Sequence, residues 1–292
     1  MADDTRVPET NDLSRRDFVT LSVAAGLAAA AGTTAAQAGV VETSVEVKTA
    51  DGTCDAAFIH PSSGRHPGVI IWPDAFGLRA SMRDMAKRLA ADGYSVLVPN
   101  PYYRVTRAPG IDAEGFSFQN QDNMATLRKL MGGIGAAGAA EGDAAAFVAF
   151  LDAQPSVDTA KKIGTQGYCM GGPLVFRTAA AVPNRIGAGG SFHGGGLVTA
   201  APDSPHTLIP KMKARLYVAI ASNDDARQPD AKDTLRAAFA AAKVPAEIEV
   251  YQSLHGWCVP DMPAEAGKPI YNKPEAEKAW AKLVALYKAA LG

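Results

Sequence analysis

The chain has 292 residues, 47% of them hydrophobic and 20% charged, so it has an ordinary globular composition and enough length to bury a full core in one domain. Its 29 Lys and Arg residues nearly balance its 30 Asp and Glu residues, which leaves a formal net charge of −1. This balance, without a run of basic residues and interleaved aromatics, argues against nucleic acid or an anionic membrane surface as a partner.

The first 38 residues contain the three parts of an export signal in the usual order. A twin-arginine segment, Ser14-Arg15-Arg16-Asp17-Phe18-Val19, precedes an apolar stretch over 19–31, and Ala36-Gln37-Ala38 is a small-x-small cleavage site. The apolar stretch is too short for a comfortable membrane span. We therefore predict a signal peptide over 1–38, a mature domain over 39–292 with net charge +1, no membrane association after cleavage, and a periplasmic or secreted location.

Strand-like and helix-like runs alternate along the mature chain. The runs 41–49 and 54–60 predict a hairpin across Asp51-Gly52, and the apolar run 68–72 predicts a strand buried on both faces. Further strands are predicted over 94–98, 161–166, 186–192, 215–221 and 246–251, and helices over 78–92, 136–154, 172–182, 230–243 and 274–290. This order predicts one α/β domain with a mostly parallel central sheet and helices on both faces. Ligands of such sheets bind beyond the carboxyl ends of the strands.

The segment Gly167-Tyr168-Cys169-Met170-Gly171-Gly172 is the most informative motif. It places one cysteine between glycines, after a predicted strand and before a predicted helix, in the pattern G-x-S-x-G with sulfur in place of oxygen. A sharp strand-to-helix turn strains its central residue and leaves room only for glycine on either side. The helix amino terminus offers free N–H groups that favour a thiolate and a developing oxyanion. The motif predicts a nucleophile elbow, and a glycine-rich turn around a structural cysteine is the alternative.

A cysteine nucleophile needs a base and a group that orients the base. In this architecture the order along the chain is nucleophile, acid, histidine. Of five histidines, His255 is the one that follows a strand late enough in the chain to fit. The acid is expected after the strand 215–221, where Asp224 and Asp225 are adjacent; we favour Asp224 and leave Asp225 open.

With these residues in place, the chain resembles the dienelactone hydrolase family of α/β-hydrolases over nearly all of the mature sequence. The likeness is carried by the elbow and by three further segments: Trp72-Pro73-Asp74-Ala75-Phe76-Gly77-Leu78, the Asp224/Asp225 turn, and His255-Gly256-Trp257 followed by Pro260-Asp261. The resemblance implies Cys169 as nucleophile, His255 as base and Asp224 as orienting acid. It also implies that the backbone N–H groups of Met170 and Ala75 form the oxyanion hole.

Two charged positions acquire roles from the same resemblance. The family often has a glutamate that pairs with the resting thiol, and here that place holds Asp74, which is one methylene shorter. Arg104 matches an arginine that clamps the substrate carboxylate with two parallel hydrogen bonds. A second clamp arginine is expected four residues after His255, where this chain has Val259. That departure points to a small ester or lactone other than a dienelactone.

The remaining motifs narrow the site further. Candidate walls of an apolar substrate pocket are the aromatic residues Phe76, Tyr102, Tyr103 and Trp257. The run from His193 to Gly196 looks like the oxyanion motif of lipases but lies downstream of the nucleophile, so it is interpreted as a loop near the pocket rim. No cluster has the spacing of a metal site, and no cofactor motif is present. Cys54 and Cys258 are expected to be free and partly buried, although a disulfide between them stays open.

The sequence therefore predicts a cofactor-free hydrolase of small carboxylic esters or lactones (EC 3.1.1 type), monomeric or a small homo-oligomer. Its predicted mechanism uses a Cys-His-Asp triad and an acyl-thioester intermediate. Two alternatives belong to other classes. Cys169 could be a redox or peroxide-reactive thiol with Cys258 as its resolving partner, or the fold could be a binding protein without catalysis.

Overall fold

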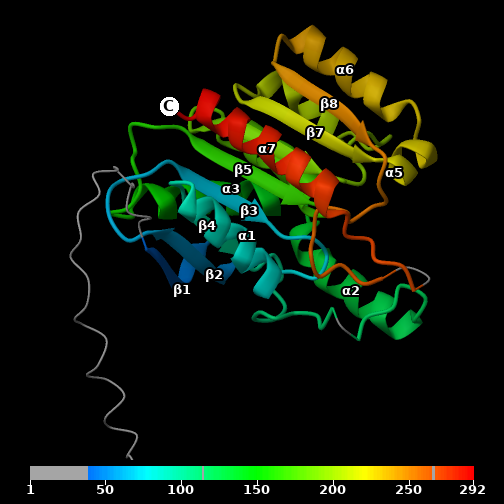
Figure 1. The fold of residues 1–292 in the computed structure, drawn as a ribbon, viewed down its shortest axis with the longest axis horizontal. Helices are drawn as coiled ribbons and strands as arrows, with labels where there is room; N and C mark the ends of the chain where they lie inside the picture. The colour runs from blue at the N-terminus through cyan, green and yellow to red at the C-terminus, as the bar shows by residue number, and fades with distance from the viewer. Residues whose placement is uncertain (1–38, 114, 265–266) are drawn as a thin grey trace, which may run out of the picture. The chain divides into compact units, whose positions relative to one another are not determined.

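The computed structural model describes residues 39–113, 115–264 and 267–292, so the predicted signal peptide over 1–38 lies outside the described residues. Within them the central sheet has eight strands in the order β1-β2-β4-β3-β5-β6-β7-β8 (Figure 1). The strands are β1 (Val40–Thr49), β2 (Gly52–Pro61), β3 (Gly68–Trp72), β4 (Ser95–Pro99), β5 (Ile163–Tyr168), β6 (Ile186–Phe192), β7 (Arg215–Ala221) and β8 (Ala246–Tyr251).

Strand direction agrees with the prediction. β1 pairs antiparallel with β2 in the hairpin across Asp51-Gly52, and β2 pairs antiparallel with β4. All other neighbours, from β4 and β3 through to β8, pair in parallel. The predicted mostly parallel α/β sheet is therefore confirmed.

Helices cover both faces of this sheet. Figure 1 shows α1 and α7 crossing the near face, and helices α3, α4 and α6 pack on the other. The bounds are α1 (Ala80–Ala91), α3 (Ala139–Asp152), α4 (Gly171–Ala181), α6 (Ala231–Ala242) and α7 (Lys273–Ala290). β3 shows why both faces are apolar: Ile70 and Trp72 join the core of α3 and α4, while Val69 and Ile71 join the core of α1 and α7. Successive strand residues point to opposite faces, so a strand covered on both sides must be apolar throughout.

Three elements were not predicted: α2 (Gln121–Ile134), the 3₁₀ helix η2 (Pro205–Lys211) and α5 (Ser222–Arg227). α2 begins after Asn120, whose side chain accepts the N–H groups of Asp122 and Asn123. Its buried residues Leu127, Leu130 and Ile134 have helical spacing, but the glycines that follow Met131 obscured that signal. α5 is a six-residue helix directly after β7, too short for a periodic pattern.

No single helix of the described ranges is both long and apolar enough to cross a membrane; one bent pair, α2 with α3, would qualify by length and composition alone.

The parallel strands β5, β6, β7 and β8 end at one edge of the sheet. The residues that follow them directly include Cys169 after β5, His193 after β6, the Asp224 turn after β7, and the His255 loop after β8. The topology thus gathers the predicted chemistry at the carboxyl edge.

Candidate active site

The turn from Gly167 to Gly172 has the backbone of a strained elbow. β5 ends at Tyr168, α4 begins at Gly171, and Cys169 between them has φ 51°, in the left-handed region that non-glycine residues rarely adopt. A Cβ on Gly167 would collide with the backbone of Gly171, and one on Gly171 with the carbonyl oxygens of Trp72 and Pro73. The glycines are therefore needed because α4 approaches β5 and the end of β3 at backbone distance.

Cys169, His255 and Asp224 are neighbours at the carboxyl edge of the sheet. Nδ1 of His255 is 2.6 Å from Oδ2 of Asp224. Cys169 lies close enough to the same imidazole to raise its pKa, and Nε2 is the ring nitrogen that Asp224 leaves unused. Asp225 instead accepts a hydrogen bond from Nζ of Lys232 at 2.8 Å. Of the two adjacent carboxylates, only Asp224 is placed to orient the histidine.

The electrostatics of His255 favour its charged form. Burial opposes a charge on the imidazole, but the hydrogen bonds with Asp224 and Cys169 outweigh it and raise the pKa of His255 to about 10. The side chain of Asp224 is 13% exposed, so its attraction for the imidazolium is only partly screened by water. A protonated imidazole in this position can act as a general acid.

Backbone contacts hold the acid and histidine loops together. The N–H of His255 donates to Oδ1 of Asn223 at 2.8 Å, and the N–H of Ser222 donates to the carbonyl of Ser253 at 2.9 Å. Asn223 thereby holds the backbone of His255, the histidine whose ring is oriented by the next residue, Asp224. Sequence reasoning did not single out Asn223.

The two predicted oxyanion donors lie on segments joined by one tyrosine. Tyr102 donates its hydroxyl to the carbonyl of Ala75 at 2.7 Å and contacts Sδ of Met170 at 3.6 Å. Burial raises the pKa of Tyr102, so its hydroxyl keeps its proton. No backbone hydrogen bond among the described residues uses the N–H of Ala75 or of Met170. Both groups are therefore available to an incoming oxyanion.

Asp74, predicted to tune the thiol, is bound elsewhere. Its two carboxylate oxygens accept hydrogen bonds from Arg79 at 2.7 and 2.9 Å, and Oδ1 also accepts the N–H of Phe76 at 2.9 Å. Arg79 in turn reaches both oxygens of Asp261, six residues beyond His255. Asp74 thus anchors the loop that carries Ala75 and makes no hydrogen bond with Cys169. Arg79 and Asp261 were missed as site residues because their contact spans 182 positions.

Comparisons with known proteins identify the family of the chain. The sequence profile of the dienelactone hydrolase family matches residues 54–291. The chain belongs to the dienelactone hydrolase family. Its class of activity is accordingly that of a carboxymethylenebutenolidase-like hydrolase of carboxylic esters or lactones.

Individual relatives of this dienelactone hydrolase family member are distant. A carboxymethylenebutenolidase of Rhodococcus opacus is 26% identical over 237 residues, which cover 76% of this chain and 85% of that protein. The crystal structure of a dienelactone hydrolase-like promiscuous phosphotriesterase from metagenomic libraries superposes with a TM-score of 0.70 at 22% identity, covering 87% of this chain and 99% of that one. The dienelactone hydrolase of Anabaena variabilis gives a TM-score of 0.54 at 16% identity, covering 87% and 99%. The two structures support the fold.

Arg104 does not lie free for a substrate in this hydrolase. Its guanidinium donates to Asp51 at 2.6 and 2.9 Å and to Asp143 at two points, both 2.8 Å, and it stacks over the ring of Tyr103. Asp143 is buried and also accepts the hydroxyl of Tyr103 at 2.7 Å. The guanidinium is therefore occupied by two carboxylates beside the β1–β2 hairpin. These contacts give the predicted carboxylate clamp no free donor pair.

The cavity beside His255 has walls other than the predicted ones. It has a volume of about 430 Å³, and its apolar lining includes Phe116, Phe118, Met262 and Ile270. Phe76 lies behind Phe116, with the two ring centroids 5.2 Å apart.

The other three predicted wall residues do not line this cavity. Tyr102 supports the Ala75 loop, Tyr103 lies with Arg104, and Trp257 is fully buried against Tyr251. Phe116 and Phe118 were missed because they sit in a glycine- and serine-containing loop without periodicity.

His193 was assigned to the pocket rim but is fully buried. Its Nδ1 accepts the backbone N–H of Cys169 at 3.1 Å, and its ring meets the ring of His255 edge to face at 4.8 Å. Burial, with the nearby His255 adding to it, holds the pKa of His193 well below its usual range. A neutral imidazole therefore supports both the nucleophile backbone and the base. The His-Gly-Gly-Gly run was the available signal: its histidine contacts the elbow, whereas Gly195 and Gly196 are exposed and line a separate hollow.

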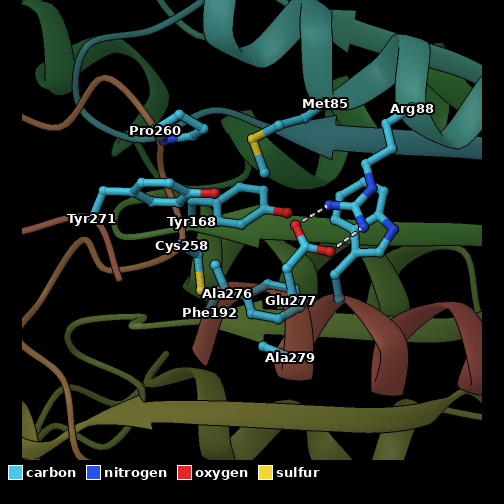
Figure 2. A pocket seen from close by; sticks show the side chains of 11 residues that line it. Met85, Arg88, Tyr168, Phe192, Cys258, Pro260, Tyr271, Ala276, Glu277 and Ala279 are labelled. Atoms are coloured by element: carbon cyan, nitrogen blue, oxygen red, sulfur yellow. Dashed lines mark hydrogen bonds and ion pairs between the residues drawn. The ribbon is translucent and has the colours of Figure 1, made fainter. Parts of the chain in front are cut away.

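The two other cysteines are free and lie in different cores. Cys54 belongs to the core of α3 and α4, and Cys258 to the core of α1 and α7, so a disulfide between them is not formed. Burial raises the pKa of both thiols. Cys258, Tyr168 and Phe192 line a hollow of about 50 Å³ together with Arg88 and Glu277. Figure 2 shows these side chains and the ion pair between Arg88 and Glu277. This hollow is too small for a substrate.

Among the described residues, no group of three or more His, Cys, Asp and Glu side chains is placed to hold a metal ion.

Proposed function

We propose that this chain hydrolyses small carboxylic esters or lactones through a Cys169–His255–Asp224 triad and an acyl-thioester intermediate. The observation that carries the proposal is the position of Cys169 on a strained elbow beside an imidazole, His255, that Asp224 orients through a hydrogen bond of 2.6 Å. Nucleophile, base and orienting group in this relation are the geometric signature of covalent acyl transfer.

The acylation step follows from these positions. The sulfur of Cys169 attacks the acyl carbon, and the carbonyl oxygen takes the negative charge between the N–H groups of Met170 and Ala75. When the tetrahedral intermediate collapses, the bond to the alcohol oxygen breaks and protonated His255 gives that oxygen its proton. The products are the free alcohol and a thioester on Cys169.

Deacylation reverses the roles of the same groups. Neutral His255 takes a proton from water, the hydroxide attacks the thioester carbon, and the carbon–sulfur bond breaks. The carboxylic acid leaves and the thiolate–imidazolium pair is restored. Throughout, Asp224 holds the imidazole in the tautomer that presents Nε2 to Cys169.

Trapping of the intermediate tests the proposal. The purified chain is mixed with p-nitrophenyl acetate, and the protein mass and p-nitrophenol release are followed together. We expect Cys169→Ala to lose at least about 1,000-fold in kcat and to gain no acyl mass, because no sulfur remains to attack. Cys54→Ala and Cys258→Ala are matched controls, since each removes a buried thiol outside the triad, and both should still acylate. Undiminished turnover in folded Cys169→Ala would overturn the mechanism.

The redox alternative finds less support in the geometry. A resolving thiol must be accessible and readily ionised. Cys258 is 7% exposed, packs in the core of α1 and α7, and has a pKa raised by burial. We therefore retain the hydrolase proposal alone.

A further inference from the structure

One wall of the cavity beside His255 is an aromatic cluster. The rings of Phe116 and Phe118 meet edge to face at 5.0 Å, and Phe76 contacts both, at 5.2 and 6.1 Å. Phe118 is 54% exposed, although it lines the cavity. Met262 and Ile270 also line it. An exposed large apolar side chain in a concave site favours an apolar group as its contact.

The charges around this cavity do not suit a carboxylate. Arg79 and Arg104 are each held by two acidic side chains, so neither guanidinium has a free face for an anion. Arg227 lines the cavity, but it is 74% exposed and lies 3.4 Å from the carboxylate of Asp224. A solvated guanidinium already beside an acid contributes little to binding an anion.

The neighbouring surface offers no unpaired cation at Arg79 either. A second hollow of about 980 Å³ shares Phe116 and Pro263 with the first, and the ion-paired Arg79 and Asp261 line it. Val259 is fully buried in the core of α1 and α7 and offers no contact to a substrate. A substrate carboxylate here would be desolvated against aromatic rings, and the cations in the lining are the solvated Arg227 and the imidazole of His255, both already paired with Asp224, so its burial costs free energy.

We infer that the substrate of this site is an uncharged ester whose acyl group is hydrophobic and fits against Phe116 and Phe118. The inference rests on the proposed triad, because it assigns the cavity beside His255 to the acyl group that Cys169 would receive. Neutral aryl or medium-chain alkyl esters fit this description, whereas esters and lactones that carry a free carboxylate do not.

A matched pair of esters tests the inference. p-Nitrophenyl valerate and the mono-p-nitrophenyl ester of glutaric acid share a leaving group and chain length, and differ by a terminal methyl against a carboxylate. We expect kcat/KM to favour the valerate by on the order of 30-fold or more, since the site offers the carboxylate no paired cation. The preference should persist in high salt, because it arises from desolvation rather than from screened surface charge.

Two outcomes separate this inference from the mechanism beneath it. If neither ester nor p-nitrophenyl acetate is hydrolysed, the proposed function fails. If both esters are hydrolysed and the glutarate is used equally well or better, the mechanism stands and the inference about the substrate is overturned.

Substitution of Phe118 tests whether the acyl group of the substrate contacts this ring. Phe118→Ala should lower kcat/KM for the valerate by about 10-fold, mainly through KM. The kcat/KM for p-nitrophenyl acetate should change much less, because the short acetyl group does not reach the ring. Phe118→Leu should retain most of the valerate activity. Val41→Ala is the control for general effects on the protein, because Val41 is also an exposed apolar side chain but lies on β1. An unchanged valerate-to-acetate ratio in Phe118→Ala would contradict the assignment.

Discussion

At the scale of single residues, the turn after β7 separates two chemically identical side chains into different tasks. Asp224 lies 2.6 Å from the imidazole of His255, and Asp225 is 2.8 Å from Lys232. Asn at position 224 would keep the size of the side chain but remove the charge that supports imidazolium. We expect Asp224→Asn to lower kcat for p-nitrophenyl acetate at pH 7 by about 100-fold or more.

Asp225→Asn is the matched control for this prediction. It removes the same charge one residue away, from a partly buried ion pair with Lys232 that does not involve His255, so kcat should stay within about twofold of the wild-type value. An equal loss in both variants would mean that the net charge of the turn, rather than the contact with His255, sustains activity.

The sequence predicted those residues of the site that depend on chain order and failed on those that depend on distant partners. The elbow motif singled out Cys169; chain order then singled out His255 and narrowed the acid to two neighbours, because the order of strands fixes what meets at the carboxyl edge. Arg104 could not be placed this way. Its guanidinium is bound by Asp51 and Asp143, which are 53 and 39 positions away, and no local pattern announces such a contact.

At the scale of elements, Arg79 joins two loops whose relative position matters to the proposed mechanism. Its guanidinium is bound by Asp74, on the loop of Ala75 after β3, and by Asp261, beyond His255 after β8. Its side chain is only 8% exposed and that of Asp74 only 1%. Arg79→Met would leave Asp74 buried without a cation. We expect a loss of about 3–5 kcal/mol in the free energy of unfolding, measured by urea denaturation.

Arg83→Met is the control for this substitution, because Arg83 pairs with Glu42 where both side chains are more than a quarter exposed. Its effect should stay below about 1 kcal/mol. Should Arg79→Met fail to fold, the double variant Asp74→Asn/Arg79→Met removes the unpaired charge and should recover stability while kcat stays low. A stability loss no larger than that of Arg83→Met would contradict the role given to Arg79.

The elements themselves were predictable wherever burial imposed a simple pattern. β3, β6, β7 and β8 have the predicted bounds. β3 is a short apolar run buried on both faces that ends at a turn residue, whereas the edge strand β8 alternates charged and apolar residues. α2 was missed although Leu127, Leu130 and Ile134 have helical spacing, because Gly132 and Gly133 are poor helix formers. Tertiary packing of those three apolar residues overrides the weak local propensity.

At the scale of the whole described domain, the sheet separates two cores that serve different purposes. The core of α1 and α7 contains Cys258 and Trp257, close to His255 in the chain, whereas the core of α3 and α4 contains Cys54, a residue of β2. Both thiols are buried, and burial raises their pKa values. Cys169, at the carboxyl edge between the layers, is the partly exposed thiol among the three cysteines of the chain. An alkylating reagent added to the folded protein should therefore modify the elbow selectively.

The charged imidazole also links the stability of the domain to pH. The pKa of His255 is raised from its ordinary value of 6.5 to about 10 by Asp224 and Cys169, which outweigh burial. Because the native state holds this proton more tightly than the unfolded chain, the stabilisation is fully present below about pH 6.5 and is lost as pH rises through about 10. We expect the difference in unfolding free energy between wild type and His255→Gln to shrink from pH 6 to pH 10.5. Urea titrations of wild type and His255→Gln at several pH values measure this difference. Groups that titrate alike in both proteins contribute equally to the two free energies of unfolding, so their contributions cancel. A difference that grew with pH would mean that His255 is neutral in the native protein, and the thiolate–imidazolium pair would then have to be abandoned.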